Sequence, residues 1–596
     1  MNLEELAEEI FNNDTLSKAV LLWNKDRQTA IDNFGDINTW NVGQVTNMNN
    51  LFYDEKKFND DINNWNVSKV ESMDYMFAHA YKFNKPLEKW NVSSVKSMKG
   101  MFYHATNFDQ SLNSWNVSNV VNMKGMFFGT KKFNQPLNKW DMRKVISMSY
   151  MFSNSINFNQ DLNNWELDNL MSCKYMFQDC ILFNSPLDNW NVKKVVTIEG
   201  MFKNAIKFNQ PLYNWQFKQL DNMQSLFENA TDFNHNINIW DVFTVTNMKG
   251  VFKRAINFNQ ELDKWDVSNV ENMQEMFSLA KTFNQELNKW NTIRVNNMSF
   301  MFSGAEIFNK YLNSWKTENV ILMNHMFAQA TYFNQDLSEW NVSKVMDMSW
   351  MFANAINFNQ SLEDWKVGNV RNMEHMFNGA NKFNKPLNKW NVSLVNNMES
   401  MFENASIFNQ PLQKWDVSHV TNMSIMFAKA TEFDQPLNEW IVSNVIDMRG
   451  MFSNAINYNK DINDWDVSNV KNMEGMFLNA KNFNSNLNKW NVSNVENMSS
   501  MFFGTSQFDN MLTNWDVSKV TNMKFMFDGN NILRKKFYPK KMDIKMLGDY
   551  YENKYKNKYF KYKNKYLNYK DKYLNYKDKY LNYKDKYLNY KDKYLK

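Results

Sequence analysis

Six histidines and two cysteines are the side chains of this 596-residue chain best suited to bind metals or act as nucleophiles. His79 and His104 are 25 residues apart, and His325 and His375 are 50 apart. If the chain repeats with that period, His79 and His104 would stack and touch. Two imidazoles alone do not make a zinc site, which needs three or four ligands. We therefore interpret these histidines as exposed helix residues and assign no metal ligand.

The remaining chemistry-bearing residues do not form a catalytic set. Two cysteines exclude a disulfide framework, and Cys173 and Cys180 replace apolar residues of a repeat, which indicates reduced core thiols. The sequence has no phosphate-binding loop, no H-E-x-x-H, no G-x-S-x-G and no EF-hand loop. We assign no catalytic, cofactor-binding or metal-binding residue. We expect a protein that is not an enzyme, with no cofactor and no small-molecule substrate.

A strict repeat supplies the elements that position every side chain. Tryptophan recurs every 25 residues from Trp40 to Trp515, which makes 20 units without insertion or deletion. Counting from each Trp as position 0, the unit reads W-[ND]-V-x-x-V-x-x-M-x-x-M-F-x-x-A-x-x-F-N-x-x-L-x-x. Position +12 is Phe in every unit, from Phe52 to Phe527. Such a period is typical of a solenoid, in which each unit packs on its neighbours.

The spacing within a unit predicts its conformation. Met at +8, Met-Phe at +11 and +12, and Ala at +15 follow the i, i+3, i+4, i+7 pattern of a short helix, as in Met98, Met101, Phe102 and Ala105. Seven of the eight prolines lie at +21, and proline cannot donate to a ladder, so a strand should begin near Leu at +22. We predict an α/β repeat solenoid of the irregular leucine-rich-repeat type. Each unit would hold one short parallel strand and one helix of two to three turns.

When such units stack, the residues at one repeat position line up in a column, and two kinds of column follow. The Trp, Phe and Met columns carry most of the large apolar side chains, and we interpret them as core. Position +19 is Asn or Asp from Asn59 to Asp509. A row of ligand contacts is one interpretation, but a polar ladder that satisfies backbone groups between units is favoured.

The repeat motif resembles a known family. W-N-V-S-x-V-x-x-M-x-x-M-F-x-x-A-x-x-F-N-x-x-L, from about Ile37 to Tyr538, looks like the BspA-like leucine-rich repeat family in its Mycoplasma-lipoprotein type. The resemblance implies an irregular leucine-rich-repeat solenoid and, by analogy with bacterial members, a surface or adhesion role. The Asn- and Lys-rich composition and the KYLNYKD tail are similar to proteins of Mimivirus-type giant viruses.

Three segments are expected. Residues 1–36 form an N-terminal helical cap, with Asp14 and Thr15 as candidate N-caps and Gly35 as a stop signal. Residues 37–539 form the solenoid. Residues 540–596 form a long C-terminal helix, because tyrosines from Tyr555 onward alternate in steps of 4 and 3, which is a heptad pattern.

Charge separates the tail from the body. The segment 534–596 holds 21 basic and 7 acidic residues, or +14, which leaves −9 for residues 1–533. A homo-oligomeric coiled coil is one interpretation of the tail, but its Lys-flanked seam would place Lys against Lys. Docking on an anionic partner (nucleic acid, membrane or acidic protein) is the second, and a solvated tail is the third.

The favoured function is a non-enzymatic repeat scaffold that binds an unidentified protein partner. The alternative is a tether, in which the basic C-terminal helix docks on an anionic surface and the solenoid is a spacer. We expect no transmembrane segment and no signal peptide, and hence an intracellular location, in host cytoplasm or a virion if the protein is viral.

Overall fold

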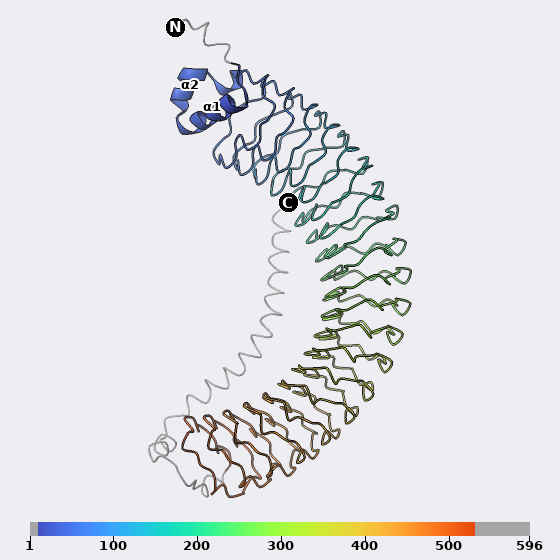
Figure 1. The fold of residues 1–596 in the computed structure, drawn as a ribbon, viewed down its shortest axis with the longest axis vertical. Coiled ribbons are helices and arrows are strands. Elements are labelled where there is room, and N and C mark those ends of the chain that lie inside the picture. The colour runs from blue at the N-terminus through green and yellow to red at the C-terminus, as the bar shows by residue number, and fades with distance from the viewer. Residues whose placement is uncertain (1–9, 531–596) are drawn as a thin grey trace, which may run out of the picture.

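The computed structural model describes residues 10–530, which form a crescent of stacked coils capped at the N-terminal end by two helices (Figure 1). Helix α1 spans Asn13–Lys25, helix α2 spans Arg27–Phe34, and a single 3-10 turn, η2, spans Ile37–Thr39. We name each coil by the Trp at its position 0. The repeat solenoid that the sequence predicts is therefore present, with one 25-residue unit in each coil.

The helical cap covers the first coil. Phe11, Trp23 and Phe34 all pack on Trp40, with ring centroids 5.1 to 5.9 Å apart. The Trp23 indole also donates to Asp60 Oδ2 at 2.9 Å. These contacts close the open end of the Trp column against water.

The cap begins and ends where its side chains satisfy free backbone groups. Asn12, rather than the predicted Asp14 or Thr15, is the N-cap of α1. Its Oδ1 accepts from the backbone of Asp14 and Thr15, while the Thr15 hydroxyl accepts from the Asn12 backbone, which makes a reciprocal capping box. Gly35, at φ 74°, ends α2 as predicted, since glycine adopts this backbone conformation without strain.

The helix predicted within each unit is wrong. Positions +10 and +14 have positive φ in all 20 coils, as in Tyr75 and His79, so no α-helix runs through +8 to +15. Instead, the N–H groups of +11, +13 and +15 close tight turns onto carbonyls three residues earlier. Those of +8, +10, +12 and +14 donate to the next coil: Tyr75 donates to Lys99 O and Phe77 to Met101 O. Successive turns give the same apolar spacing as a helix while linking neighbouring coils.

The strand predicted near Leu at +22 is also wrong. Within residues 10–530 no strand is formed, and parallel pairing is reduced to isolated bridges at position +7, from Asn47 and Ser72 to Asn497 and Asn522. Proline at +21 does exclude a ladder there. The pairing lies on the other side of the coil, where each backbone can reach both neighbours.

The interior columns are as the sequence predicts. The Trp, Phe, Met and Leu columns are buried along the whole solenoid. Phe77 stacks on Phe102 of the next coil at 5.5 Å and on Phe83 of its own coil at 4.1 Å. Trp rings of neighbouring coils stack on each other, as Trp90 does on Trp115. From Trp65 onward, each indole Nε1 donates to the carbonyl oxygen of the residue 28 positions earlier, as Trp115 does to Leu87 O at 2.9 Å.

The Asn column at +19 is the predicted polar ladder. Asn59 Oδ1 accepts from the N–H of Asn84, and Asn84 Oδ1 accepts from the N–H of Asp109, both at 2.9 Å. Where Gln follows, its Nε2 adds a second bond to the same ladder, as from Gln110 to Asn84. These side chains satisfy backbone between coils and are not arranged around a ligand.

The predicted long helix at 540–596 lies outside the described residues, as does the start of the cap at residues 1–9. The boundaries 1–36, 37–539 and 540–596 therefore remain predictions.

Candidate interaction surface

The histidines that the sequence singles out lie in surface columns. His79 and His104 are neighbours at +14, with ring centroids 5.3 Å apart, and Tyr103 and Phe128 pack around them. Burial, followed by the neighbouring His79, lowers the pKa of His104. Among residues 10–530, no group of three His, Cys, Asp or Glu side chains is placed to hold a metal ion.

His325 and His375 belong to a feature that the sequence did not reveal. Both lie at +10, and Trp350 of the intervening coil lies between them. Phe300, His325, Trp350 and His375 stack in that order, with centroids 4.2, 5.5 and 3.8 Å apart and planes within 20°. We call these four residues the ring ladder. Burial lowers the pKa of His375 to about 4, with a smaller contribution from His325.

The ring ladder occupies strained backbone. Its four residues have φ between 54° and 59°, where a side chain with a Cβ costs roughly 1–2 kcal/mol. Some other coils avoid this strain because they have glycine at the same position, as at Gly100, Gly125 and Gly450. The signal that could have revealed the ladder was Trp350 itself, one of only two tryptophans outside the 25-residue series.

Cys173 and Cys180 are free and fully buried. Burial raises the pKa of Cys173 to about 12 and also raises that of Cys180. The Cys180 thiol donates to Phe152 O at 2.8 Å. Both are core thiols held in the protonated form, which is the unreactive one.

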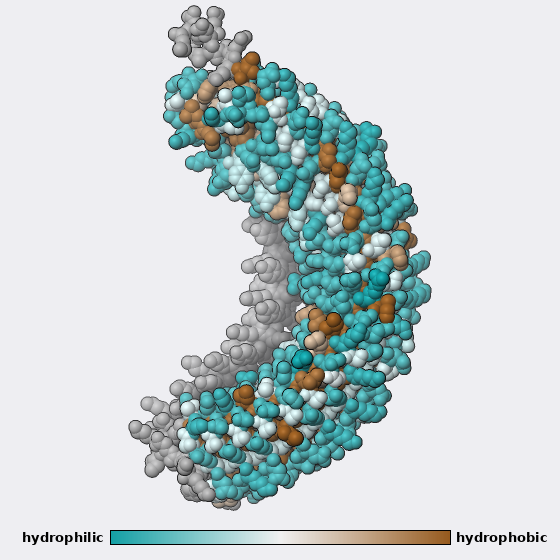
Figure 2. Space-filling view, viewed as in Figure 1, coloured by the Kyte–Doolittle hydropathy of each residue, from teal (hydrophilic) through white to brown (hydrophobic). Residues whose placement is uncertain are grey.

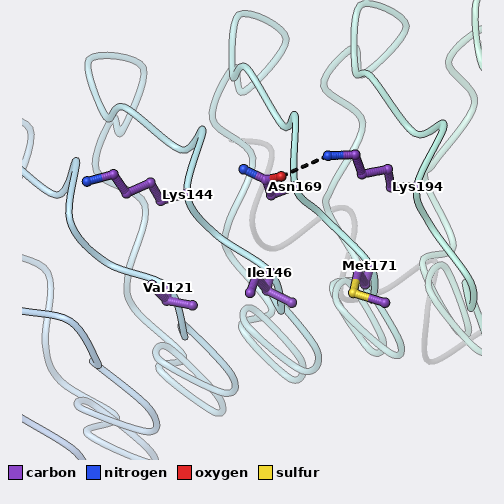
Figure 3. Close-up of a pocket in the computed structure, with 6 residues that line it drawn as sticks. All are labelled: Val121, Lys144, Ile146, Asn169, Met171 and Lys194. Carbon is purple, nitrogen blue, oxygen red and sulfur yellow. Dashed lines mark hydrogen bonds between the residues drawn. The ribbon is translucent and has the colours of Figure 1, made fainter.

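A shallow groove of about 380 Å³ lies on the surface of the coils of Trp115, Trp140, Trp165 and Trp190. Two rows of side chains line it (Figure 3). The first row, at +6, is apolar, and the second, at +4, is polar. The lining residues are Val121, Ile146 and Met171 in the first row and Lys144, Asn169 and Lys194 in the second.

The apolar row is the longest run of its kind in its column. Val121, Ile146, Met171 and Val196 follow one another on four coils, and we call them the apolar strip. The first three are 37%, 41% and 45% exposed. Elsewhere exposed apolar residues lie in separated patches on a mostly hydrophilic face (Figure 2). The strip ends at Lys96 on one side and Asp221 on the other.

The polar row presents cations without carboxylate partners. Lys144 Nζ donates to Asn119 Oδ1 at 2.6 Å, and Lys194 Nζ donates to Asn169 Oδ1 at 2.8 Å. Within the described part of the chain, neither lysine forms an ion pair, although many other lysines do, as Lys174 does with Glu199. Asparagine oxygens accept from the two ammonium groups and hold them beside the strip.

Sequence reasoning missed this groove. Positions +4 and +6 vary in residue type from coil to coil, and no continuous charge stripe marks a binding face. Reading each column from coil to coil would have shown four consecutive apolar residues at +6.

The comparisons with known proteins identify the repeat. A family described as "Mycoplasma protein of unknown function, DUF285" matches residues 24–140, 123–240, 221–340, 283–385, 357–461 and 431–540. This confirms the expected Mycoplasma-type repeat family, whereas the expected similarity to giant-virus proteins has no support in the matches. No curated protein is significantly similar to the chain.

A similar solved structure is that of the TLR13–ssRNA13 complex. It is 13% identical over 82% of this chain and 80% of that chain, with a TM-score of 0.16. At that TM-score the two chains do not superpose, so neither fold nor function is inferred from the match. None of the helices within residues 10–530 is both long and apolar enough to span a bilayer.

Proposed function

Because the chain belongs to the DUF285 family of Mycoplasma repeat proteins, and because its repeats build a rod with a stable interior, we propose that it is a non-enzymatic scaffold for protein recognition. The observation that carries the proposal is the groove. Its apolar strip exposes side chains on consecutive coils and is the longest apolar run at position +6.

The division between columns supports this proposal. Interior positions keep their residue type across 20 coils, so the rod folds in the same way along its length. Surface positions change from coil to coil without altering the fold, which lets one stretch of coils differ from the rest. A catalytic role has no nucleophile–base pair or metal set to support it among the described residues.

Two finer expectations have no structural support. An adhesion role follows only from family resemblance. The tether, in which a basic tail docks on an anionic surface, depends on residues 540–596, which lie outside the described part of the chain. The groove is the reason for proposing a recognition surface on the solenoid.

The test is affinity capture with the full-length chain from cells of the organism that encodes it. One bait is the wild type, the second carries Ile146→Asp and Met171→Asp, and the matched control carries Ile446→Asp. Ile446 occupies +6 alone and is 47% exposed. We expect a protein that the wild type and the control retain and the double variant loses. Identical protein sets on all three baits would contradict the proposal.

A further inference from the structure

The groove carries enough detail to specify the chemistry of its partner. We propose that it binds an acidic amphipathic α-helix of a partner protein. The inference rests on the proposed recognition function and names the class of partner for that same surface. Three features of the groove lead to it: its backbone, the spacing of its side chains and its charge.

The backbone of the groove has no free edge. The N–H groups of Ile146, Met171 and Val196 each donate to the carbonyl of the +6 residue on the preceding coil, at 2.9 Å. A partner strand that adds to a sheet needs unpaired N–H and C=O groups. Those groups are already used between coils, so recognition must come from side chains.

The spacing of the apolar strip suits a helix. Coils joined by parallel bridges repeat at about 4.8 Å. The apolar face of an α-helix, with one residue per turn at i, i+4, i+7 and i+11, offers a side chain about every 5.5 Å along its axis. An extended chain places same-face side chains about 6.7 Å apart, which falls out of register within a few coils. Four coils therefore match about ten residues of helix, lying along the solenoid axis.

The charge of the groove specifies acidic flanks on that helix. Lys144 and Lys194 lie two coils apart beside the strip, each held by an asparagine oxygen and neither ion-paired. A helix seated on Val121, Ile146 and Met171 would bring its flanking residues to these ammonium groups. Carboxylates there would gain charge-assisted hydrogen bonds, whereas lysines would meet like charge.

A reduced copy of the arrangement lies elsewhere in the same columns. Ile321 and Met346 are exposed at +6, and Lys344 Nζ donates to Asn319 Oδ1 at 2.7 Å. This copy has two apolar residues in place of four. We expect it to bind the same class of helix more weakly, since it buries less apolar area.

The test measures binding of a fluorescent synthetic helix to the full-length chain by anisotropy. The probe is a peptide of about 18 residues, long enough to hold helical structure, with leucines at i, i+4, i+7 and i+11 and glutamates flanking them. A second peptide replaces every glutamate with lysine. A third has the composition of the first but two central prolines, which break the helix.

We expect the glutamate peptide to bind and the other two to bind at least about tenfold more weakly, a difference of roughly 1.4 kcal/mol. Two double variants should each weaken binding of the glutamate peptide by a similar factor: Lys144→Glu with Lys194→Glu, and Ile146→Asp with Met171→Asp. Ile446→Asp should leave its affinity unchanged. Because the basic segment 534–596 could attract any acidic peptide, only affinity lost with the groove substitutions counts as support.

Three results would overturn the inference: equal or tighter binding of the lysine peptide, equal binding of the proline peptide, or glutamate-peptide binding that ignores the groove substitutions. These failures are separable from failure of the proposed function. If the capture experiment yields a groove-dependent partner while the glutamate peptide does not bind, the scaffold stands and the helical partner is wrong.

Discussion

Two sets of stacked rings in this molecule differ in burial: the interior rings of every coil and the surface rings of the ring ladder. Phe302 lies in the interior column and Phe300 in the ladder, only two residues apart. Both stack on a ring of the next coil, Phe300 on His325 at 4.2 Å and Phe302 on Phe327 at 5.7 Å. The interior ring is fully buried on unstrained backbone, whereas the ladder ring is half-buried at φ 59°.

The difference separates what folds the rod from what varies along it. An interior ring excludes water from both neighbouring coils, so its column must be filled in every coil. A ladder ring adds a local contact on strained backbone, and several other coils have glycine or serine at the same position, as at Gly100 and Ser400. Ring stacking alone therefore does not identify the core; burial and backbone conformation do.

The largest expected effect is that of Phe302→Ala. Its ring packs on Phe277, Phe308 and Phe327, with no exposed surface. We expect the free energy of unfolding to fall by about 3–5 kcal/mol, because the substitution leaves a cavity in a packed column. Phe300→Ala in the same coil should cost less than about 1.5 kcal/mol. Urea denaturation of both variants measures the difference, and equal losses would remove the distinction between interior and ladder.

A smaller effect is expected from Trp315→Phe. The substitution keeps most of the buried ring but removes the indole N–H that donates to Leu287 O at 2.9 Å. The Leu287 carbonyl keeps its bond from the Trp290 N–H at 3.1 Å, so we expect a loss of about 0.5–1.5 kcal/mol, the net contribution of one hydrogen bond. The matched control is Trp350→Phe in the ladder, where water can replace the lost donor. Thermal unfolding measures the difference. If the two variants lose the same amount of melting temperature, the interior indole hydrogen bonds contribute little to stability.

Trp350→Gly should lower the free energy of unfolding by no more than about 2 kcal/mol. The loss of stacking on His325 and His375 removes about 0.5–1.5 kcal/mol for each contact, while glycine relieves roughly 1–2 kcal/mol of strain at φ 59°. The comparison is Trp315→Gly, which should unfold the surrounding coils. A large loss for Trp350→Gly, measured by urea denaturation, would mean that the ladder also holds the fold.

A further effect appears only as the pH falls. The pKa of His375 is about 4 in the folded chain, against about 6.5 for an unfolded histidine. As the pH falls from 6.5 to 4, the unfolded chain binds a proton that the folded chain does not, so this contribution to stability is present above pH 6.5 and is lost across that window. Glu374, whose Oε1 lies 3.6 Å from His375 Nε2, and His325 are the neighbouring titratable groups.

Denaturation midpoints between pH 4 and 7 test this assignment. We expect His375→Gln to flatten the pH dependence, while His419→Gln, which replaces an exposed histidine in another coil, leaves it unchanged. If the denaturation midpoint of His375→Gln changes with pH as steeply as that of the wild type, His375 is not held neutral by its burial.

The sequence allowed the interior to be predicted but not the path of the backbone. The 25-residue period fixed the Trp, Phe and Met columns, and Gly35 marked the end of the cap. The spacing of Met98, Met101, Phe102 and Ala105 is equally suited to a helix and to successive turns. Between +8 and +15, the N–H groups of +8, +10, +12 and +14 donate to the next coil, and these bonds decide in favour of turns. The sequence of a single unit does not show the carbonyl groups that accept them.

The same reason explains why the surface features escaped prediction. Val121 and Ile146, or Phe300 and His325, are 25 residues apart and become neighbours only when coils stack. Patterns along the chain describe one coil, whereas a surface on a solenoid runs across coils. Columns read at fixed positions carry that information.

The central claim is that recognition resides in the groove of the coils of Trp115 to Trp190 and not in the ring ladder. Hydrogen–deuterium exchange of the full-length chain, with and without the partner obtained by capture, tests it most directly. We expect binding of the partner to slow amide exchange only in about residues 117–198. Protection centred on residues 300–375, or on 540–596 with none in the groove, would contradict it.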